Sequence, residues 1–263
     1  VAERDDGEHG VARPQPAPSS GDGSGTQRGH ARRSRAAGRR AAPLTPSERA
    51  ALSDVNRFGL LGAAHLGAWH FGGPAATAAR LAALVRGGYL RVVRPRYAGR
   101  EVYLITAAGA GAARAAAGAG APGGLRPAPF VPALAAHHLA VADVAAALLR
   151  QYPGSSWVTE RELRRLAARA PDRWEYPGHP PDGALVLGGQ TLAVEVELTA
   201  KGPGSYRRIL GWYAAALDYA AVVWFCEGAS LRRRLTALIA TEGLEGVAVV
   251  RPLPPGAAAG PWG

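Results

Sequence analysis

The chain has 263 residues, which is enough for one large domain or two small domains with hydrophobic cores. Its net charge of +11 and its pI of about 10.7 favour an anionic partner, and nucleic acid is the first candidate. The single cysteine, Cys226, excludes an internal disulfide and a cysteine-based metal centre. No run reaches the roughly 18 apolar residues of a membrane-spanning helix, and the N-terminus has no apolar signal segment. We therefore expect a cytoplasmic protein without membrane contact.

Residues 1–43 are rich in proline, glycine, serine and charge. They are predicted to be disordered, because they cannot bury enough apolar surface to offset the entropy lost on ordering. The later part of this segment is a basic arm, with Arg28, Arg32, Arg33, Arg35, Arg39 and Arg40. Such an arm is either a solubilising tail or a non-specific phosphate-binding segment.

Residues 44–106 are predicted to form a small helical unit that ends in a hairpin. The run Thr45-Pro46-Ser47-Glu48 supplies a cap, an early proline and an acid at the start of a helix that extends to about residue 56. Helices over residues 62–69 and 75–86 follow, and strands are expected over residues 89–94 and 101–105. Three helices followed by a two-stranded wing resemble a winged helix-turn-helix domain, a fold that implies DNA binding or, alternatively, protein contacts.

In such a domain the third helix would enter the major groove. Its outward positions are mostly alanine, so only Arg80, helped by Thr77, could read a base edge through hydrogen bonds. The wing carries basic side chains suited to phosphates, namely Arg91, Arg94, Arg96 and Arg100. The pattern predicts DNA binding that depends strongly on charge and discriminates weakly between sequences.

Residues 107–131 are rich in alanine, glycine and proline and are predicted to be a linker, with or without a short helix at its start. The helix expected from residue 132 to residue 151 contains His137, His138 and Asp143. Adjacent histidines point in different directions on a helix. Two interpretations stay open: ordinary core packing, or the approach of one imidazole to the acidic hairpin that follows.

That hairpin holds three carboxylates. Asp182 lies just before an apolar strand over residues 184–187, and a Gly188-Gly189 turn follows that strand. Glu195 and Glu197 share one face of a second strand over residues 191–199. Grouped carboxylates are costly unless a cation joins them, and a divalent metal is the usual partner of oxygen ligands. The alternative is an exposed acidic hairpin paired with arginines such as Arg207, Arg208 or Arg165.

The remaining elements are predicted from apolar periodicity and from glycine and proline breaks. They are a short strand over residues 157–160, a basic helix over 161–170, a helix over 205–218, strands over 221–226 and 246–251 on either side of a helix over 230–241, and a loose tail over 252–263. Arg207 and Arg208 lie in the first turn of the helix that begins at residue 205 and are candidate phosphate contacts.

The order helix, strand, hairpin, helix, strand over residues 132–226, with Pro181-Asp182 and Glu195-Val196-Glu197 on successive strands, resembles the core of the PD-(D/E)XK nuclease superfamily. With the winged helix in front, the segments HHLAVAD, WVTERELR, HPPDG and VEVELTAKG resemble the replication-relaxation family of plasmid and mobile-element proteins, over residues 45–250. The expected fold is therefore α+β or α/β, with a winged helix-turn-helix over residues 44–106 and a mixed-sheet, restriction-endonuclease-like αβββαβ core over residues 132–251. The resemblance implies double-stranded DNA, and plasmid replication proteins, as partners.

The nuclease resemblance implies that Asp182 and Glu195 bind Mg²⁺ or Mn²⁺. Glu197 stands where that pattern has a lysine, and Lys201, the only lysine of the chain, follows four residues later. Either Lys201 supplies the ammonium, or Glu197 is a further ligand, or the site has lost its chemistry. The candidate catalytic residues are thus Asp182, Glu195, Glu197 and Lys201. A metal-dependent nicking enzyme and a non-catalytic DNA-binding regulator or accessory factor both remain open, whereas no tyrosine motif supports a covalent relaxase.

Overall fold

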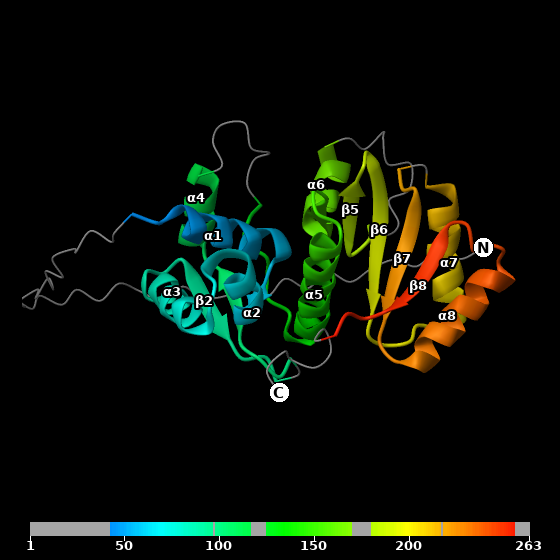
Figure 1. Cartoon of the computed structure of the whole chain (residues 1–263), viewed down its shortest axis with the longest axis horizontal. Helices are drawn as coiled ribbons and strands as arrows, with labels where there is room; N and C mark the ends of the chain where they lie inside the picture. The colour runs from blue at the N-terminus through cyan, green and yellow to red at the C-terminus, as the bar shows by residue number, and fades with distance from the viewer. Residues whose placement is uncertain (1–42, 97, 117–124, 170–179, 217, 256–263) are drawn as a thin grey trace, which may run out of the picture. The chain divides into compact units, whose positions relative to one another are not determined.

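The computed structural model describes residues 43–96, 98–116, 125–169, 180–216 and 218–255. Most of the predicted N-terminal arm and the end of the predicted tail lie outside these residues. The described residues belong to one unit, residues 41–263, in which the two segments predicted as domains pack together. Helices and two sheets occur in the unit, so the predicted α+β class is confirmed (Figure 1).

The N-terminal part contains helices around a three-stranded antiparallel sheet with strand order β1-β3-β2. Its elements are α1 (Pro46–Phe58), β1 (Leu61–Gly62), α2 (Ala63–Leu66), the π-helical turn η1 (Gly67–Phe71), α3 (Pro74–Arg86), β2 (Leu90–Val93), β3 (Val102–Ile105) and α4 (Ala107–Ala116). The second predicted helix is thus a short α-helix continued by a π turn, and a strand of two residues precedes it.

Helix α1 begins where its sequence predicts. The Glu48 N–H donates to Thr45 Oγ1 over 3.2 Å, and the Thr45 N–H donates to Glu48 Oε2 over 2.7 Å. This reciprocal pair is a capping box, which satisfies two backbone donors that the first helical turn leaves free. The inward face of α1 places Leu52 and Val55 in the N-terminal core.

Helix α4 is the short helix that the sequence left open at the start of residues 107–131. Ala110 and Ala113 are buried in the same core as Leu52 of α1. Gly109 shows why small residues are needed, since a Cβ at this position would lie 2.2 Å from the Tyr89 carbonyl oxygen. The alanine and glycine content that suggested a linker is what allows α4 to pack closely.

The C-terminal part is built on a five-stranded sheet with strand order β4-β5-β6-β7-β8. Its elements are η2 (Pro132–Leu134), α5 (Ala135–Gln151), β4 (Ser156–Thr159), α6 (Glu160–Arg169), β5 (Gly183–Leu187), β6 (Gln190–Glu197), α7 (Pro203–Ala215), β7 (Ala221–Cys226), α8 (Ala229–Thr241) and β8 (Ala248–Pro252). Strands β4, β5 and β6 pair antiparallel, whereas β6, β7 and β8 pair parallel.

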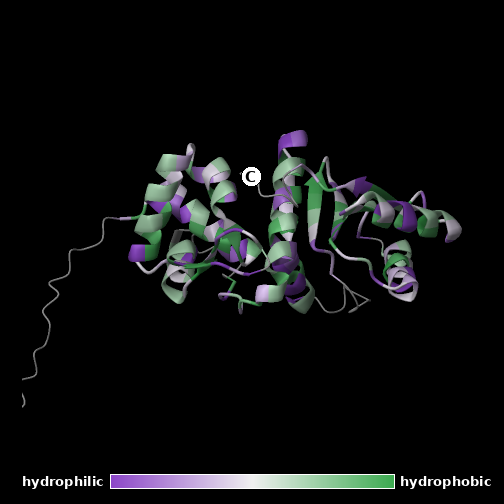
Figure 2. Cartoon of the chain, turned by 90° about the horizontal axis from the view of Figure 1, so that it is seen from below, coloured by the Kyte–Doolittle hydropathy of each residue, from purple (hydrophilic) through white to green (hydrophobic). Residues whose placement is uncertain are grey.

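Helix α5 covers one face of this sheet, and α7 and α8 cover the other (Figure 1). Val194 and Val196 of β6 pack on the α5 side, and Ala193 packs on the α7 and α8 side. The predicted alternation of faces along β6 is therefore confirmed. The strands are largely hydrophobic, as expected for a sheet covered on both faces (Figure 2).

Helix α5 is the central helix of the unit. The segment Pro132–Gln151 is long and apolar enough to cross a membrane by length and composition alone, but half of it is buried here. Val144 and Leu148 pack on the five-stranded sheet, while Ala142 faces the N-terminal core. These contacts account for the apolar sequence of α5.

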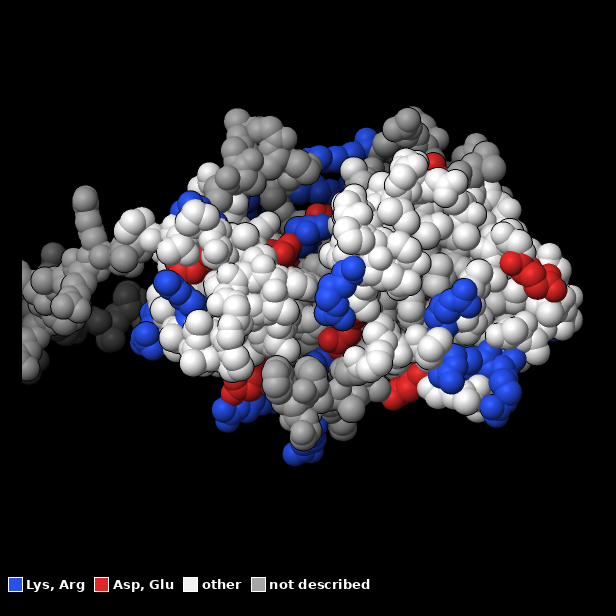
Figure 3. Space-filling model, viewed as in Figure 1, with Lys and Arg blue, Asp and Glu red and all other residues white. Residues whose placement is uncertain are grey.

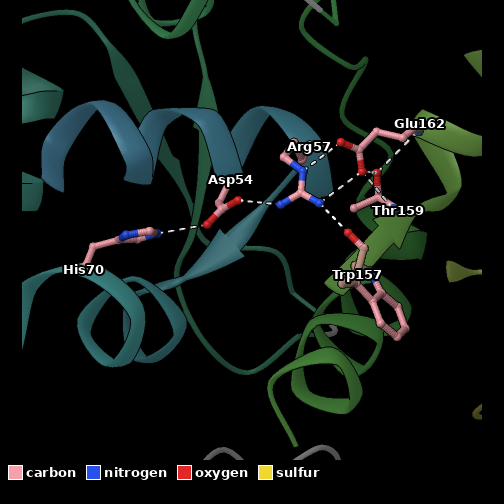
Figure 4. A network of polar contacts seen from close by, with 6 residues as sticks. All are labelled: Asp54, Arg57, His70, Trp157, Thr159 and Glu162. Atoms are coloured by element: carbon pink, nitrogen blue, oxygen red, sulfur yellow. Dashed lines mark hydrogen bonds and ion pairs between the residues drawn. The ribbon is translucent and has the colours of Figure 1, made fainter. Parts of the chain in front are cut away.

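Arg57, in the last turn of α1, connects the N-terminal part to β4 and α6 (Figure 4). Its guanidinium donates to both carboxylate oxygens of Glu162, over 2.8 and 3.2 Å, and to the Trp157 carbonyl oxygen over 2.5 Å. It also contacts Asp54 over 2.9 Å, and His70 lies 3.0 Å from the other oxygen of Asp54. One cation thus joins α1, β4 and α6.

A second polar network connects the N-terminal part to α5. Asp143 of α5 accepts from Arg100 over 2.8 Å, and its other oxygen lies 2.8 Å from His65 Nε2. His65 is buried, and the side chain of Arg100 is only 20% exposed. Arg100, shortly before β3, is therefore bound to the central helix.

Candidate functional site

Asp182 lies immediately before β5 and is held by two contacts. The Val196 N–H donates to Asp182 Oδ2 over 2.8 Å, and His137 Nε2 lies 2.9 Å from Asp182 Oδ1. Burial disfavours the charged imidazole of His137, but the hydrogen bond and charge of Asp182 outweigh this effect and raise the pKa of His137. Of the two adjacent histidines, His137 is thus the one that approaches the acidic hairpin. Burial, followed by the charge of His137, lowers the pKa of His138.

Glu195 lies next to Asp182 across paired strands. Gly183 is opposite Val194 in the antiparallel register, so the preceding Asp182 falls beside Glu195. The carboxylate of Glu195 is buried, at 3% exposure, and accepts from the hydroxyl of Tyr213 on α7. Burial and the charge of Glu195 raise the pKa of Tyr213 far above its ordinary value, so this phenol stays a hydrogen-bond donor.

Glu197 is also buried, and its carboxylate contacts Lys201 Nζ. Burial disfavours the charged ammonium, but the hydrogen bond to Glu197 outweighs it and raises the pKa of Lys201. The Lys201 N–H donates to the hydroxyl of the fully buried Tyr206 over 3.0 Å, which fixes the backbone at that point. The side chain of Lys201 therefore reaches the carboxylate of Glu197, and the two form an ion pair.

The hairpin acids can be tested as a metal site from these contacts. Each carboxylate already has a protein partner, and the described residues contain no group of three or more His, Cys, Asp or Glu side chains placed to hold a metal. Mg²⁺, however, commonly binds one or two carboxylates and keeps several waters, and each carboxylate oxygen has a second lone pair. A divalent cation held by Asp182 and Glu195 would have to use these second lone pairs and keep several waters, while Glu197 is engaged by Lys201.

Two tyrosines contribute to this site, and one of them, Tyr213, was not singled out in the sequence. Tyr206 and Tyr213 are seven residues apart, which places them on one face of α7, towards Glu197 and Glu195. The same helical spacing could have indicated them, since aromatic residues on an inward face can donate hydrogen bonds to buried carboxylates.

The predicted base-reading residues lie in different environments. Thr77 is 5% exposed, and its hydroxyl donates to the carbonyl oxygens of Gly72 and Gly73, so the expectation that it reads a base does not match its position. The side chain of Arg80 is 53% exposed and lies 3.2 Å from Glu48. Only Arg80 of this pair is at the surface of α3.

The four arginines predicted on the wing also separate into two groups. Arg91, Arg94 and Arg96 are exposed; Arg91 stacks over the Phe130 ring, and Arg94 pairs with Glu101. Arg100 instead turns towards α5 and binds Asp143, so it is withdrawn from the exposed group. On α7, Arg207 contacts Glu242 over 2.8 Å and Arg208 is exposed.

Comparison with known protein families finds one family whose model extends from α1 to β6. The family model for replication-relaxation proteins matches residues 52–198, from α1 through the acidic hairpin. Lys201, α7 and α8 lie beyond the matched residues. A comparison with curated proteins gives no match. Since the family match covers more than half of the sequence, the chain belongs to the replication-relaxation family.

Proposed function

We propose that the chain acts in the replication and relaxation of plasmids or other mobile elements by binding double-stranded DNA, with residues 44–106 docking as a winged helix-turn-helix. Family membership supports the biological role. The element order α1, α2, α3, β2, β3 and the net charge of +11 support the docking mode.

The observation that carries this proposal is the exposed basic hairpin beside α3. Arg91, Arg94 and Arg96 project from β2 and the loop that follows it, where no core packing requires them. The exposed face of α3 consists mainly of alanine, and Thr77 is buried. Phosphate contacts would therefore provide most of the affinity, and sequence discrimination would be weak.

Binding to labelled duplexes of two unrelated sequences tests this proposal. The double variant Arg94→Ala/Arg96→Ala should weaken binding to both duplexes and reduce the salt dependence by about two units of slope. The variant Arg164→Ala/Arg169→Ala removes the same charge from α6 and serves as the control. A wild-type chain that binds neither duplex, or a loss confined to one duplex, would refute the proposal.

A second candidate function is metal-dependent nicking of DNA by a PD-(D/E)XK-like site. The specific observation in its favour is that Asp182 and Glu195 are neighbours on paired strands, with the ammonium of Lys201 at the same end of β6. A bound divalent cation would supply Lewis-acid stabilisation of the charge that develops on a phosphodiester. In this chain, His137 and the Val196 N–H would orient Asp182, Tyr213 would orient Glu195, and Lys201 would bind a phosphate oxygen.

Incubation of supercoiled plasmid with Mg²⁺, with Mn²⁺ or with chelator tests the nicking function. Open circles should form only with metal, and Asp182→Ala should abolish them, while Asp218→Ala, an exposed acid between α7 and β7, should not. If the wild type leaves the plasmid intact under all conditions but binds it, the chain is instead a DNA-binding regulator or accessory factor. The Glu197–Lys201 pair favours that alternative, because the ammonium of Lys201 is bound by Glu197 and not free for a phosphate oxygen.

A further inference from the structure

Three consecutive arginines on α8 have no role in the functions proposed above. Arg233 and Arg234 are exposed, and Arg232 is half-buried. Within the described residues, none of the three has a carboxylate partner, in contrast to Arg57, Arg94 and Arg207. Basic side chains gather over this helix on the face seen in Figure 3. The core does not require three adjacent guanidinium groups here, because Leu231, Leu235 and Ile239 form the buried face of α8.

These arginines lie at the end of the sheet that holds the acidic hairpin. The Glu227 N–H, just before α8, donates to the Glu197 carbonyl oxygen over 2.9 Å. Cys226, opposite Glu197 in the parallel register, has a pKa raised to about 12 by burial and further by Glu197, whereas the charges of Arg232 and Lys201 act to lower it. The start of α8 thus lies at the same end of the sheet as Glu197.

A groove continues from this point along α8. It has a volume of about 500 Å³ and runs between α8 and β8, with Arg232, Arg233 and Thr236 as its polar lining and Ala237, Ala240 and Val250 among its apolar lining. The first turn of α8 has no acidic residue. The acids nearest along the chain are Glu227 before the helix and Glu242 after it, and Glu242 is bound by Arg207. The lining of the groove therefore carries two positive charges and no negative charge.

We infer that α8 and its groove form a second phosphodiester-binding surface, which holds the backbone of duplex DNA through Arg232 and Arg233 in the groove and Arg234 on the exposed side of α8. This inference rests on the proposed DNA-binding function and adds to it a contact surface outside residues 44–106 and outside the family match. Guanidinium groups suit this ligand because they donate in a planar fork to phosphate oxygens. The groove lies at the β8 edge of the sheet, two strands from Glu195 on β6, so bound DNA would run along the part of the sheet that follows the acidic hairpin.

The test measures binding of the full chain to a labelled duplex of arbitrary sequence over a series of NaCl concentrations. The triple variant Arg232→Ala/Arg233→Ala/Arg234→Ala should weaken binding about tenfold at moderate salt and reduce the slope of log K against log [salt] by about two to three. The charge-conserving variant with lysine at the same three positions should retain most of the slope. The control Arg114→Ala/Arg126→Ala/Arg150→Ala removes the same charge from three separated exposed sites and should have a smaller effect.

The outcomes separate this inference from the function on which it rests. If the wild type binds DNA and the α8 variant matches the control variant, the α8 surface is refuted while the proposed function stands. If the wild type does not bind DNA, both fail. Thermal unfolding of each variant, compared with wild type, identifies a loss of binding that is caused by unfolding. In that event the variant Arg233→Ala/Arg234→Ala decides, because it leaves the half-buried Arg232 in place. Binding by this folded variant that is no weaker than that of wild type refutes the inference.

Discussion

The contact between Arg57 and Glu162 should be a main source of the stability that joins the N-terminal part to β4 and α6. The side chain of Arg57 is 31% exposed and that of Glu162 is 30% exposed, so the pair is intermediate between a surface ion pair and a buried one. Exposed pairs contribute about 0–1 kcal/mol, and breaking a buried pair costs about 3–5 kcal/mol. Arg57 also binds Asp54 and the Trp157 carbonyl oxygen. We expect Arg57→Ala to reduce the free energy of unfolding by about 2 kcal/mol.

Urea denaturation followed by circular dichroism measures this loss as a lower midpoint at unchanged m-value. Arg57→Met keeps the aliphatic stem and should show most of the loss, which separates polar contacts from packing. The matched control is Arg164→Ala, because Arg164 is 62% exposed and pairs with Glu160 one turn away on the same helix, a contact worth about 0.3–0.5 kcal/mol.

A double-mutant cycle of Arg57→Ala with Glu162→Ala should give a coupling energy of about 1–2 kcal/mol. The reasoning is refuted if Arg57→Ala costs no more than Arg164→Ala. It is also refuted if the coupling with Glu162 is zero, because the stability would then come from the remaining contacts of Arg57.

The remaining predictions concern packing and pH. Gly109→Ala should destabilise by about 1–3 kcal/mol, because the new Cβ would lie 2.2 Å from the Tyr89 carbonyl oxygen, whereas Gly111→Ala on the same helix meets only Arg114 at 3.9 Å and should be neutral or stabilising by thermal unfolding. Burial raises the pKa of Glu162, but the hydrogen bond and charge of Arg57 outweigh it and lower that pKa. Because the folded-state pKa is depressed, the stabilisation is present above the unfolded pKa and is lost as pH falls through the folded pKa. The difference in free energy of unfolding between wild type and Glu162→Gln should therefore shrink between roughly pH 6 and pH 3, and a constant difference would contradict this assignment.

The features predicted correctly are those whose physical cause lies within a few residues. The cap at Thr45 depends on Glu48, three positions later, and the structure shows both hydrogen bonds. The alternation along β6 follows from strand geometry alone, so Val194 and Glu195 take opposite faces as expected. The order of helices and strands around the acidic hairpin was likewise readable from apolar periodicity and glycine breaks.

The sequence left one element undecided where small residues could either pack or link. Composition alone left open whether a helix begins residues 107–131, because alanine and glycine are common to flexible segments and to close helix contacts. Only the position of Tyr89 over Gly109 decides between them. The expectation for Thr77 was wrong for a different reason: Thr77 stands four and seven residues before Leu81 and Leu84, so helical spacing alone already places it on the inward face of α3.

By itself, the sequence determined the elements, the faces of the strands and the presence of three acids and one lysine near one hairpin, because these depend on local spacing. The tertiary structure decided the partners. It placed His137 rather than His138 on Asp182, Tyr213 on Glu195 and Arg100 on Asp143. A chain with 31 basic and 20 acidic side chains allows many alternative ion pairs, and only the packing of α5 and α7 against the sheet selects among them.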